Sequence, residues 1–207
     1  MKSFKLQKTY VYDLVLRTIH AVIGFSISFL IATGLYACDM EPGSDQAAIW
    51  MLHIQSGKIL AASFVARIIW GLIGTKWARW SELWHFSTWL TFAKSRKYKF
   101  DSTNLGHDPF ASLAYLGFYA LLVVMTATGF VLSGMIHNTG PMAETFFDDL
   151  ENQFQIHEIH EWGFWAIGIF AILHVGAMMY HEKRHGTPIA QAMISGYQFR
   201  HQKESQE

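Results

Sequence analysis

The sequence contains little cysteine and little charge. Its single cysteine, Cys38, excludes an intramolecular disulfide, a four-cysteine zinc site and a cysteine-ligated iron–sulfur cluster. No CxxCH motif is present, which excludes covalently attached c-type haem. Charged residues make up 15% of the 207 positions, against about 25% in ordinary soluble domains. The formal net charge is zero, so its sum says nothing about partners. We expect the lipid bilayer as a partner and no nucleic acid.

Hydrophobic residues make up 51% of the chain and gather in four long runs. Each run is near the roughly 20 residues that cross the hydrocarbon core of a bilayer. A hydrophobic run that crosses lipid must be helical, because no water is available there to form hydrogen bonds with its backbone N–H and C=O groups. We therefore predict an all-α, integral membrane four-helix bundle forming a single domain, residues 1–207. The predicted spans are about 14–36, 48–73, 109–136 and 160–181.

Lysine and arginine are absent from two of the loops between these runs, 37–47 and 137–159, which carry acidic residues instead. The basic residues outside the spans lie in the N-terminal segment, in the loop after the second span and in the C-terminal tail. Basic loops stay on the cytoplasmic side of a membrane. Both termini and the middle loop are therefore predicted to be cytoplasmic.

The middle loop mixes tryptophan and phenylalanine with basic residues between positions 77 and 100. This composition is typical of a helix that lies at the headgroup level of a membrane. An interfacial helix between the second and third spans is therefore expected. We interpret it as a membrane-surface linker rather than as a docking surface.

Four histidines lie on the predicted spans: His20, His53, His160 and His174. Ionisable residues inside a membrane are costly and usually functional. The predicted topology puts His20 and His174 near the cytoplasmic side, and His53 and His160 near the outer side. His160 and His174 are fourteen positions apart, which in a helix means about 21 Å and nearly the same face. Each pair is a candidate set of axial imidazole ligands for one haem iron.

Other interpretations of these histidines remain open. A single membrane histidine also serves as a hydrogen-bonded packing residue or a proton relay, but the two matched depths favour ligands. Zinc or copper fits less well, because His20 and His53 are too far apart in depth to share one ion. His157 competes with His160, but its offset from His174 turns it about 100° away from the shared face.

Two arginines and two glycines stand near these histidines. Arg67 follows the histidine of the second span by fourteen residues, and Arg17 precedes that of the first span by one turn. Both side chains lie at the membrane depth of the cytoplasmic histidine pair, where they suit the propionates of a haem. Ordinary anchoring of the helices at the cytoplasmic face of the membrane is the alternative. Gly24 and Gly57, each four residues after a proposed ligand, would let a flat porphyrin approach. Close helix packing explains them equally well.

With these residues in place, the chain resembles the bacterial di-haem cytochrome b-561 family, which includes the cytochrome b subunits of nickel–iron hydrogenases. The resemblance covers nearly the whole chain. It rests on VYDLVLRTIH, HIQSG, ARIIWGLIGTKWARWSEL, LGHDPFASLAYL, IHEIHEWGFW with the later ILH, and PIAQAMISG. It implies two b-type haems, one held by His20 with His174 and one by His53 with His160.

The resemblance further implies a multi-pass respiratory-chain protein of the bacterial inner membrane that exchanges electrons with the quinone pool. His107 and Asp108, at the cytoplasmic entrance of the third span, are candidates for quinone contact or proton delivery. A helix start with proline in its first turn is the alternative explanation of these residues.

The leading functional hypothesis is transmembrane electron transfer through two haems, between quinone and a redox partner on the periplasmic side. One alternative is a cytochrome b subunit and membrane anchor of a larger oxidoreductase, such as a hydrogenase. A freestanding quinone-linked oxidoreductase is another, so whether the chain is itself an enzyme stays open. From a different class, a transporter whose histidines relay protons is also considered.

Overall fold

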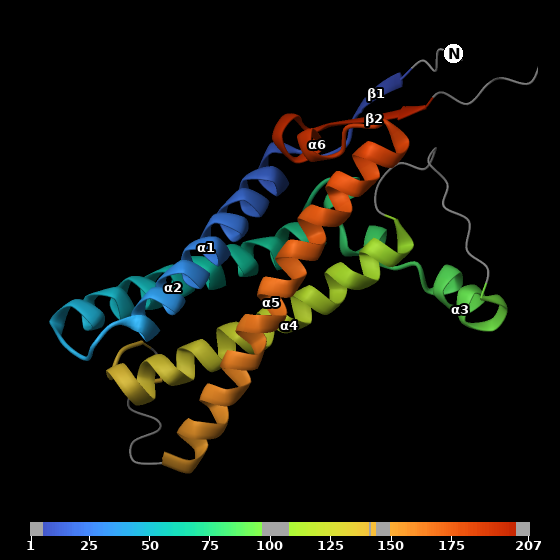
Figure 1. The fold of residues 1–207 in the computed structure, drawn as a ribbon. Helices are drawn as coiled ribbons and strands as arrows, with labels where there is room; N and C mark the ends of the chain where they lie inside the picture. The colour runs from blue at the N-terminus through green and yellow to red at the C-terminus, as the bar shows by residue number, and fades with distance from the viewer. Residues whose placement is uncertain (1–5, 97–107, 141, 144–149, 202–207) are drawn as a thin grey trace, which may run out of the picture. The chain divides into compact units, whose positions relative to one another are not determined.

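A computed structural model describes residues 6–96, 108–140, 142–143 and 150–201. The described residues include four helices long and apolar enough to cross a membrane (Figure 1). These are α1 (Leu14–Asp39), α2 (Ser44–Ile73), α4 (Pro109–His137) and α5 (Leu150–His185). The prediction of an all-α membrane protein with four spans is confirmed.

The predicted spans agree with three of these helices to within a few residues, but α5 begins at Leu150, well before the predicted start at 160. Its first turns, residues 150–159, contain several glutamates and glutamines. Such residues form helices readily but do not add to an apolar run. Hydropathy therefore marked the lipid-facing part of α5 and not the point at which its backbone becomes helical.

The expected helix in the middle loop is present. Two short 3₁₀ turns, η1 (Lys76–Ala78) and η2 (Trp80–Leu83), lead into α3 (Phe86–Ser95), which has no buried residue. The indole N–H of Trp89 in α3 donates to the carbonyl oxygen of Pro109 at 2.7 Å. This bond ties α3 to the first residue of α4.

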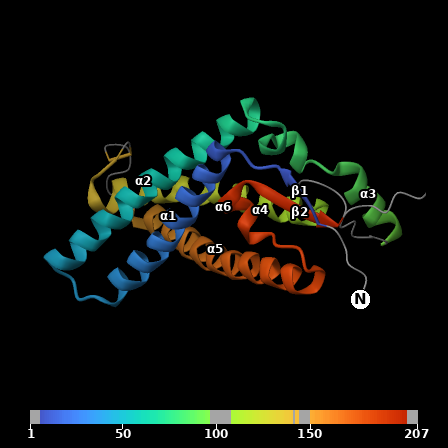
Figure 2. The same cartoon turned by 90° about the horizontal axis from the view of Figure 1, so that it is seen from above.

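The sequence did not predict that the two ends of the chain pair. Strand β1 (Leu6–Tyr10) runs antiparallel to β2 (Tyr197–His201), with Tyr10 opposite Tyr197 (Figure 1, Figure 2). Between α5 and β2, the short helix α6 (Ala190–Ser195) ends at Gly196. The Gly196 carbonyl accepts the backbone N–H groups of Val11 and Tyr12 at 2.9 and 3.1 Å.

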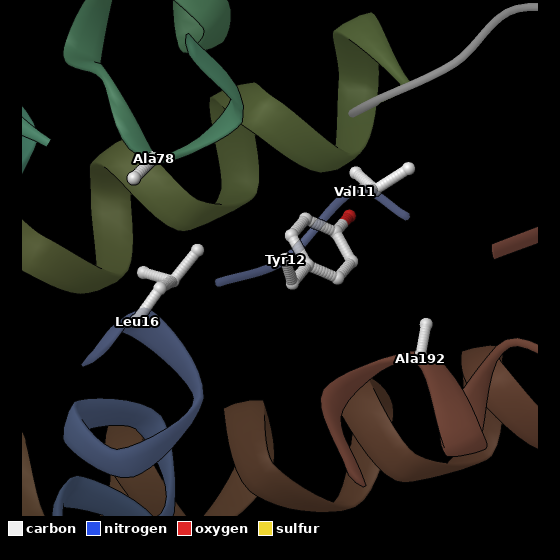
Figure 3. Packing of buried hydrophobic residues seen from close by; sticks show 5 residues of the cluster. All are labelled: Val11, Tyr12, Leu16, Ala78 and Ala192. Atoms are coloured by element: carbon white, nitrogen blue, oxygen red, sulfur yellow. The ribbon is translucent and has the colours of Figure 1, made fainter. Parts of the chain in front are cut away.

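A small hydrophobic cluster lies behind this pairing. It contains Val11, Tyr12, Leu16, Ala78 and Ala192, all buried (Figure 3). Its members come from the segment between β1 and α1, from the first turn of α1, from η1 and from α6. Residues from both ends of the sequence and from the middle loop therefore share one apolar core.

The chain divides into two compact units. The first unit comprises Met1–His20, Arg67–Gly117 and Leu173–Glu207; the second comprises Ala21–Ala66 and Phe118–Ile172. Each unit contains a segment of each of the four long helices. The division places His20 and His174 in the first unit, and His53 and His160 in the second.

Candidate functional site

In the first unit, the rings of His20 and His174 face each other. Their centroids are 6.3 Å apart and their planes are inclined at 57°. Tyr115 of α4 meets the His174 ring edge-on, with centroids 5.9 Å apart. His20 is exposed and His174 half-buried, so neighbouring side chains leave part of both rings uncovered. Helices α1 and α5 thus bring the predicted inner pair together.

The two arginines predicted near this pair also belong to the first unit. Arg67 is only 5% exposed and lies over the ring of Trp80, with its guanidinium carbon 4.6 Å from the centroid. Arg17 lies beside Gly196, and its Nε is buried with no hydrogen-bond partner within the described residues. A buried donor of this kind is costly unless a group accepts from it. Arg17 can therefore offer a hydrogen bond to an anion.

In the second unit, α1 holds His53. The Thr33 hydroxyl lies 3.1 Å from His53 Nδ1. A Cβ added to the next residue, Gly34, would lie 3.4 Å from His53 Cε1. The Nδ1 edge of the imidazole therefore lies against the α1 backbone.

Helix α4 holds His160 in the same way. The Thr128 hydroxyl lies 2.8 Å from His160 Nδ1, and a Cβ on Gly129 would lie 3.3 Å from His160 Cε1. His160 and His53 belong to the same compact unit. The structure thus brings the predicted outer pair into one unit.

The threonine and glycine contacts were missed by the sequence analysis. A signal for them exists, because the triplet Ala-Thr-Gly occurs at 32–34 and again at 127–129. One copy lies on α1 and the other on α4, and each contacts one histidine. Without knowing which helices face each other, the repeated triplet could not be connected to the histidines.

Trp50 extends the second unit's site toward the end of α4. Its indole meets the His53 ring edge-on at 5.7 Å between centroids, and lies 6.2 Å from the His137 ring. His137 is the last residue of α4. An aromatic series therefore runs from a predicted ligand to the loop that follows α4.

Gly24 and Gly57 have open space where a side chain would be. A Cβ on either residue would meet nothing within 4 Å among the described residues. Close helix packing, the alternative explanation, would put a neighbouring backbone or side chain there. The described residues therefore show no packing contact at either glycine.

The remaining predicted residues are less informative. His107 lies outside the described residues. Asp108 accepts the backbone N–H groups of Phe110 and Ala111 at 2.8 and 3.2 Å, so it caps α4 as a helix-start residue would. His157 is exposed on α5, whereas the threonine and glycine contacts of α4 are made by His160.

Comparison with known proteins identifies the family of the chain. The family described as prokaryotic cytochrome b561 matches residues 11–196. A probable Ni/Fe-hydrogenase B-type cytochrome subunit of Azotobacter chroococcum mcd 1 is 30% identical over 199 residues, covering 84% of this chain and 81% of that protein. The probable Ni/Fe-hydrogenase 1 B-type cytochrome subunit of Escherichia coli (strain K12) is 24% identical over 222 residues, covering 95% and 93%.

Proposed function

Because the chain belongs to the prokaryotic cytochrome b561 family, and is therefore a membrane b-type cytochrome that transfers electrons, we propose that its two histidine pairs hold two haem b groups. The first unit would bind one haem through His20 and His174, and the second unit another through His53 and His160. Haem b, when bound, supplies a one-electron ferric/ferrous couple at each site. Electrons would pass between the quinone pool and a periplasmic redox partner.

The observation that carries this proposal is the 6.3 Å between the ring centroids of His20 and His174. Each imidazole would hold the iron through one ring nitrogen, at a metal–nitrogen distance of about 2 Å. A centroid separation of this size would leave room for one iron between the two rings. The separation therefore supports a bis-imidazole site.

The chain's own cations fit the periphery of such a group. Haem propionates are carboxylates, and carboxylates held near lipid need charged hydrogen-bond donors. Arg17 has a buried Nε available, and Arg67 is buried within the same unit. These residues would hold the propionates of the haem in the first unit.

The partner is inferred from the relatives and from the sequence's charge distribution. The similar proteins are named as hydrogenase B-type cytochrome subunits, so a redox enzyme is the partner class we propose. Its docking face would be the periplasmic side, formed by the acidic loops. Trp50 and His137 would lie between the haem of the second unit and that face. Quinone exchange is proposed at the opposite side, near His107 and Asp108.

Spectroscopy of protein purified in mild detergent tests the haem assignment. We expect a reduced-minus-oxidised spectrum with a b-type α band and two haems per chain. His174→Ala should remove one haem and His160→Ala the other, since each loses an axial ligand. His157→Ala is the matched control and should keep both. Fewer than two haems in the unaltered chain, or two in His160→Ala, would contradict the proposal; a missing α band would favour the proton-transporter alternative.

The partner requires a separate experiment. The chain should be purified from its native membrane in mild detergent, and the proteins that remain bound identified. Recovery of a hydrogenase would support the role of cytochrome subunit. Electron transfer from reduced quinone to the isolated chain, without any partner, would support a freestanding quinone-linked protein.

A further inference from the structure

We propose that Thr33 and Thr128 select the tautomer of His53 and His160, and thereby set the reduction potential of the haem in the second unit. The inference rests on the proposed ligation by these two histidines. It adds two residues that contact the proposed ligands and act through them. Thr33 and Thr128 are therefore positioning residues.

The hydrogen bonds of Thr128 determine where its single hydroxyl hydrogen lies. Its oxygen is 2.8 Å from the carbonyl oxygen of Val124 and 3.2 Å from that of Met125. Carbonyl oxygens only accept hydrogen bonds, so the threonine must be the donor in these contacts. The same oxygen lies 2.8 Å from His160 Nδ1, and it has no second hydrogen to give. When the hydroxyl donates its hydrogen to a carbonyl, it accepts from His160, and this arrangement places a hydrogen on Nδ1 of that ring.

Thr33 makes the same set of contacts on α1. Its hydroxyl donates to the carbonyl oxygen of Phe29 at 2.8 Å, with that of Leu30 at 3.3 Å. Its oxygen lies 3.1 Å from His53 Nδ1, and with its hydrogen given to a carbonyl it is an acceptor there. In a neutral imidazole, a hydrogen on Nδ1 leaves the lone pair on Nε2. Both histidines are thus prepared to bind a metal through Nε2.

The adjacent glycines make these hydrogen bonds geometrically accessible. Gly34 and Gly129 each lie where a Cβ would touch the Cε1 atom between the two ring nitrogens, at 3.4 and 3.3 Å. Without a side chain, the imidazole can lie against the helix with Nδ1 at the threonine. Each Ala-Thr-Gly triplet therefore combines a space for the ring with an acceptor for its N–H.

The effect on potential follows from the direction of the hydrogen bond. An acceptor at Nδ1–H makes the imidazole more basic and a stronger ligand. The threonine oxygen is itself polarised, because its own hydrogen is donated to a carbonyl. A stronger ligand favours ferric over ferrous iron. Removing either hydroxyl should therefore raise the potential of the haem in the second unit.

The test replaces the hydroxyl while keeping the shape of the side chain. The hydroxyl is removed in Thr128→Val and Thr33→Val. It is retained in Thr128→Ser and Thr33→Ser. Thr126→Val is the matched control: its hydroxyl bonds the Leu122 and Val123 carbonyl oxygens on the same helix, and its described contacts include no histidine. The purified holoprotein is titrated potentiometrically at the α band, and its haem content is measured in parallel.

We expect each valine variant to keep two haems and to raise one of the two potentials. The expected loss of preference for ferric iron is of the order of tenfold, which corresponds to about 59 mV for a one-electron couple. The serine variants should titrate like the unaltered chain, and so should Thr126→Val. The ferric electron paramagnetic resonance signal of the same haem should shift together with its potential.

Several outcomes would overturn the inference while leaving the proposed haem ligation intact. The first is that the valine variants keep two haems and both reduction potentials are unchanged. The second is that Thr126→Val shifts a reduction potential by as much as the valine variants of Thr33 and Thr128 do. If a valine variant loses one haem, the serine variant decides. Retention of both haems at their normal potentials in Thr128→Ser supports the role of the hydroxyl, and loss of a haem there contradicts it. A failure of the proposed ligation would appear separately, because His53→Ala or His160→Ala would then keep both haems.

Discussion

Gly129 lies directly against His160, because a Cβ on this glycine would be only 3.3 Å from the histidine's Cε1. That distance is shorter than most carbon–carbon contacts, so even one methyl group would require the ring to move by a few tenths of an ångström. A densely packed interior resists such a shift. The position of the imidazole is therefore sensitive to side-chain size at residue 129.

We predict that Gly129→Leu loses one of the two haems, because a branched side chain displaces the His160 ring from its place on α4. Haem per chain, measured on purified protein, should fall from two to one. Ala127→Leu is the control, since Ala127 is exposed on the same helix, and it should keep both. Two haems in Gly129→Leu would show that the ring does not need this space.

A second prediction concerns Gly196, where the two ends of the chain meet. Its φ is +85°, and a Cβ there would lie 2.6 Å from the Tyr10 ring and 2.8 Å from Arg17 Nη1. The left-handed backbone alone costs an L-residue roughly 1–2 kcal/mol. Gly196→Ala should therefore lower the thermal unfolding temperature in detergent, by more than the backbone cost alone.

The control for Gly196 is another glycine with a left-handed backbone. Gly186 has φ +63°, and no atom of the described residues lies within 4 Å of a Cβ added there. Gly186→Ala therefore carries the backbone cost without the collision. Equal destabilisation of the two variants would mean that the contacts with Tyr10 and Arg17 contribute nothing.

A third prediction concerns Asp13, which precedes α1. Its carboxylate accepts hydrogen bonds from Thr75 at 2.6 Å, from Trp70 at 3.1 and 3.2 Å, and from the Leu16 backbone at 2.9 Å. Burial alone would raise the pKa of this carboxyl. The hydrogen bonds outweigh that effect and hold the pKa below its usual value of 3.8.

Because the folded-state pKa of Asp13 is lowered, its ionised form stabilises the fold above the unfolded-state pKa. That contribution is lost as the pH falls through the lowered folded value. Asp13→Asn should therefore be less stable than the unaltered chain at pH 7, by about 1–2 kcal/mol, and the difference should shrink below about pH 4. Denaturant unfolding of both proteins across this range measures it. A difference that is independent of pH would exclude the ionic contribution.

A fourth prediction concerns orientation in the membrane. The basic N-terminal segment, middle loop and tail predict that both termini are cytoplasmic. A reporter that is active only in the cytoplasm should therefore be active when fused to the C-terminus. The same reporter inserted in loop 37–47, which has no lysine or arginine, should be inactive. The opposite pattern would reverse the proposed sides for quinone and the redox partner.

Much of the fold could be predicted from the sequence because a membrane imposes simple requirements. A span must be apolar and about 20 residues long, so four helices could be predicted and were found. The early start of α5 could not be derived from hydropathy, because its first residues are helical but polar. The pairing of β1 with β2 was also missed, since it joins the two ends of the chain and neither five-residue strand has a strong pattern of its own.

The sequence by itself determined the four spans, because a span must be apolar and about 20 residues long. It also predicted the histidine pairs, from the depth of each histidine in its span and from the distribution of lysine and arginine among the loops. Tertiary structure alone decided what surrounds each histidine. Thr33 meets His53, and Thr128 meets His160, across separations of 20 and 32 residues. Contacts between different helices depend on how their side chains pack, which spacing within one helix does not specify. The Ala-Thr-Gly triplets were visible in the sequence, but only the packing of α1 and α4 gave them a role.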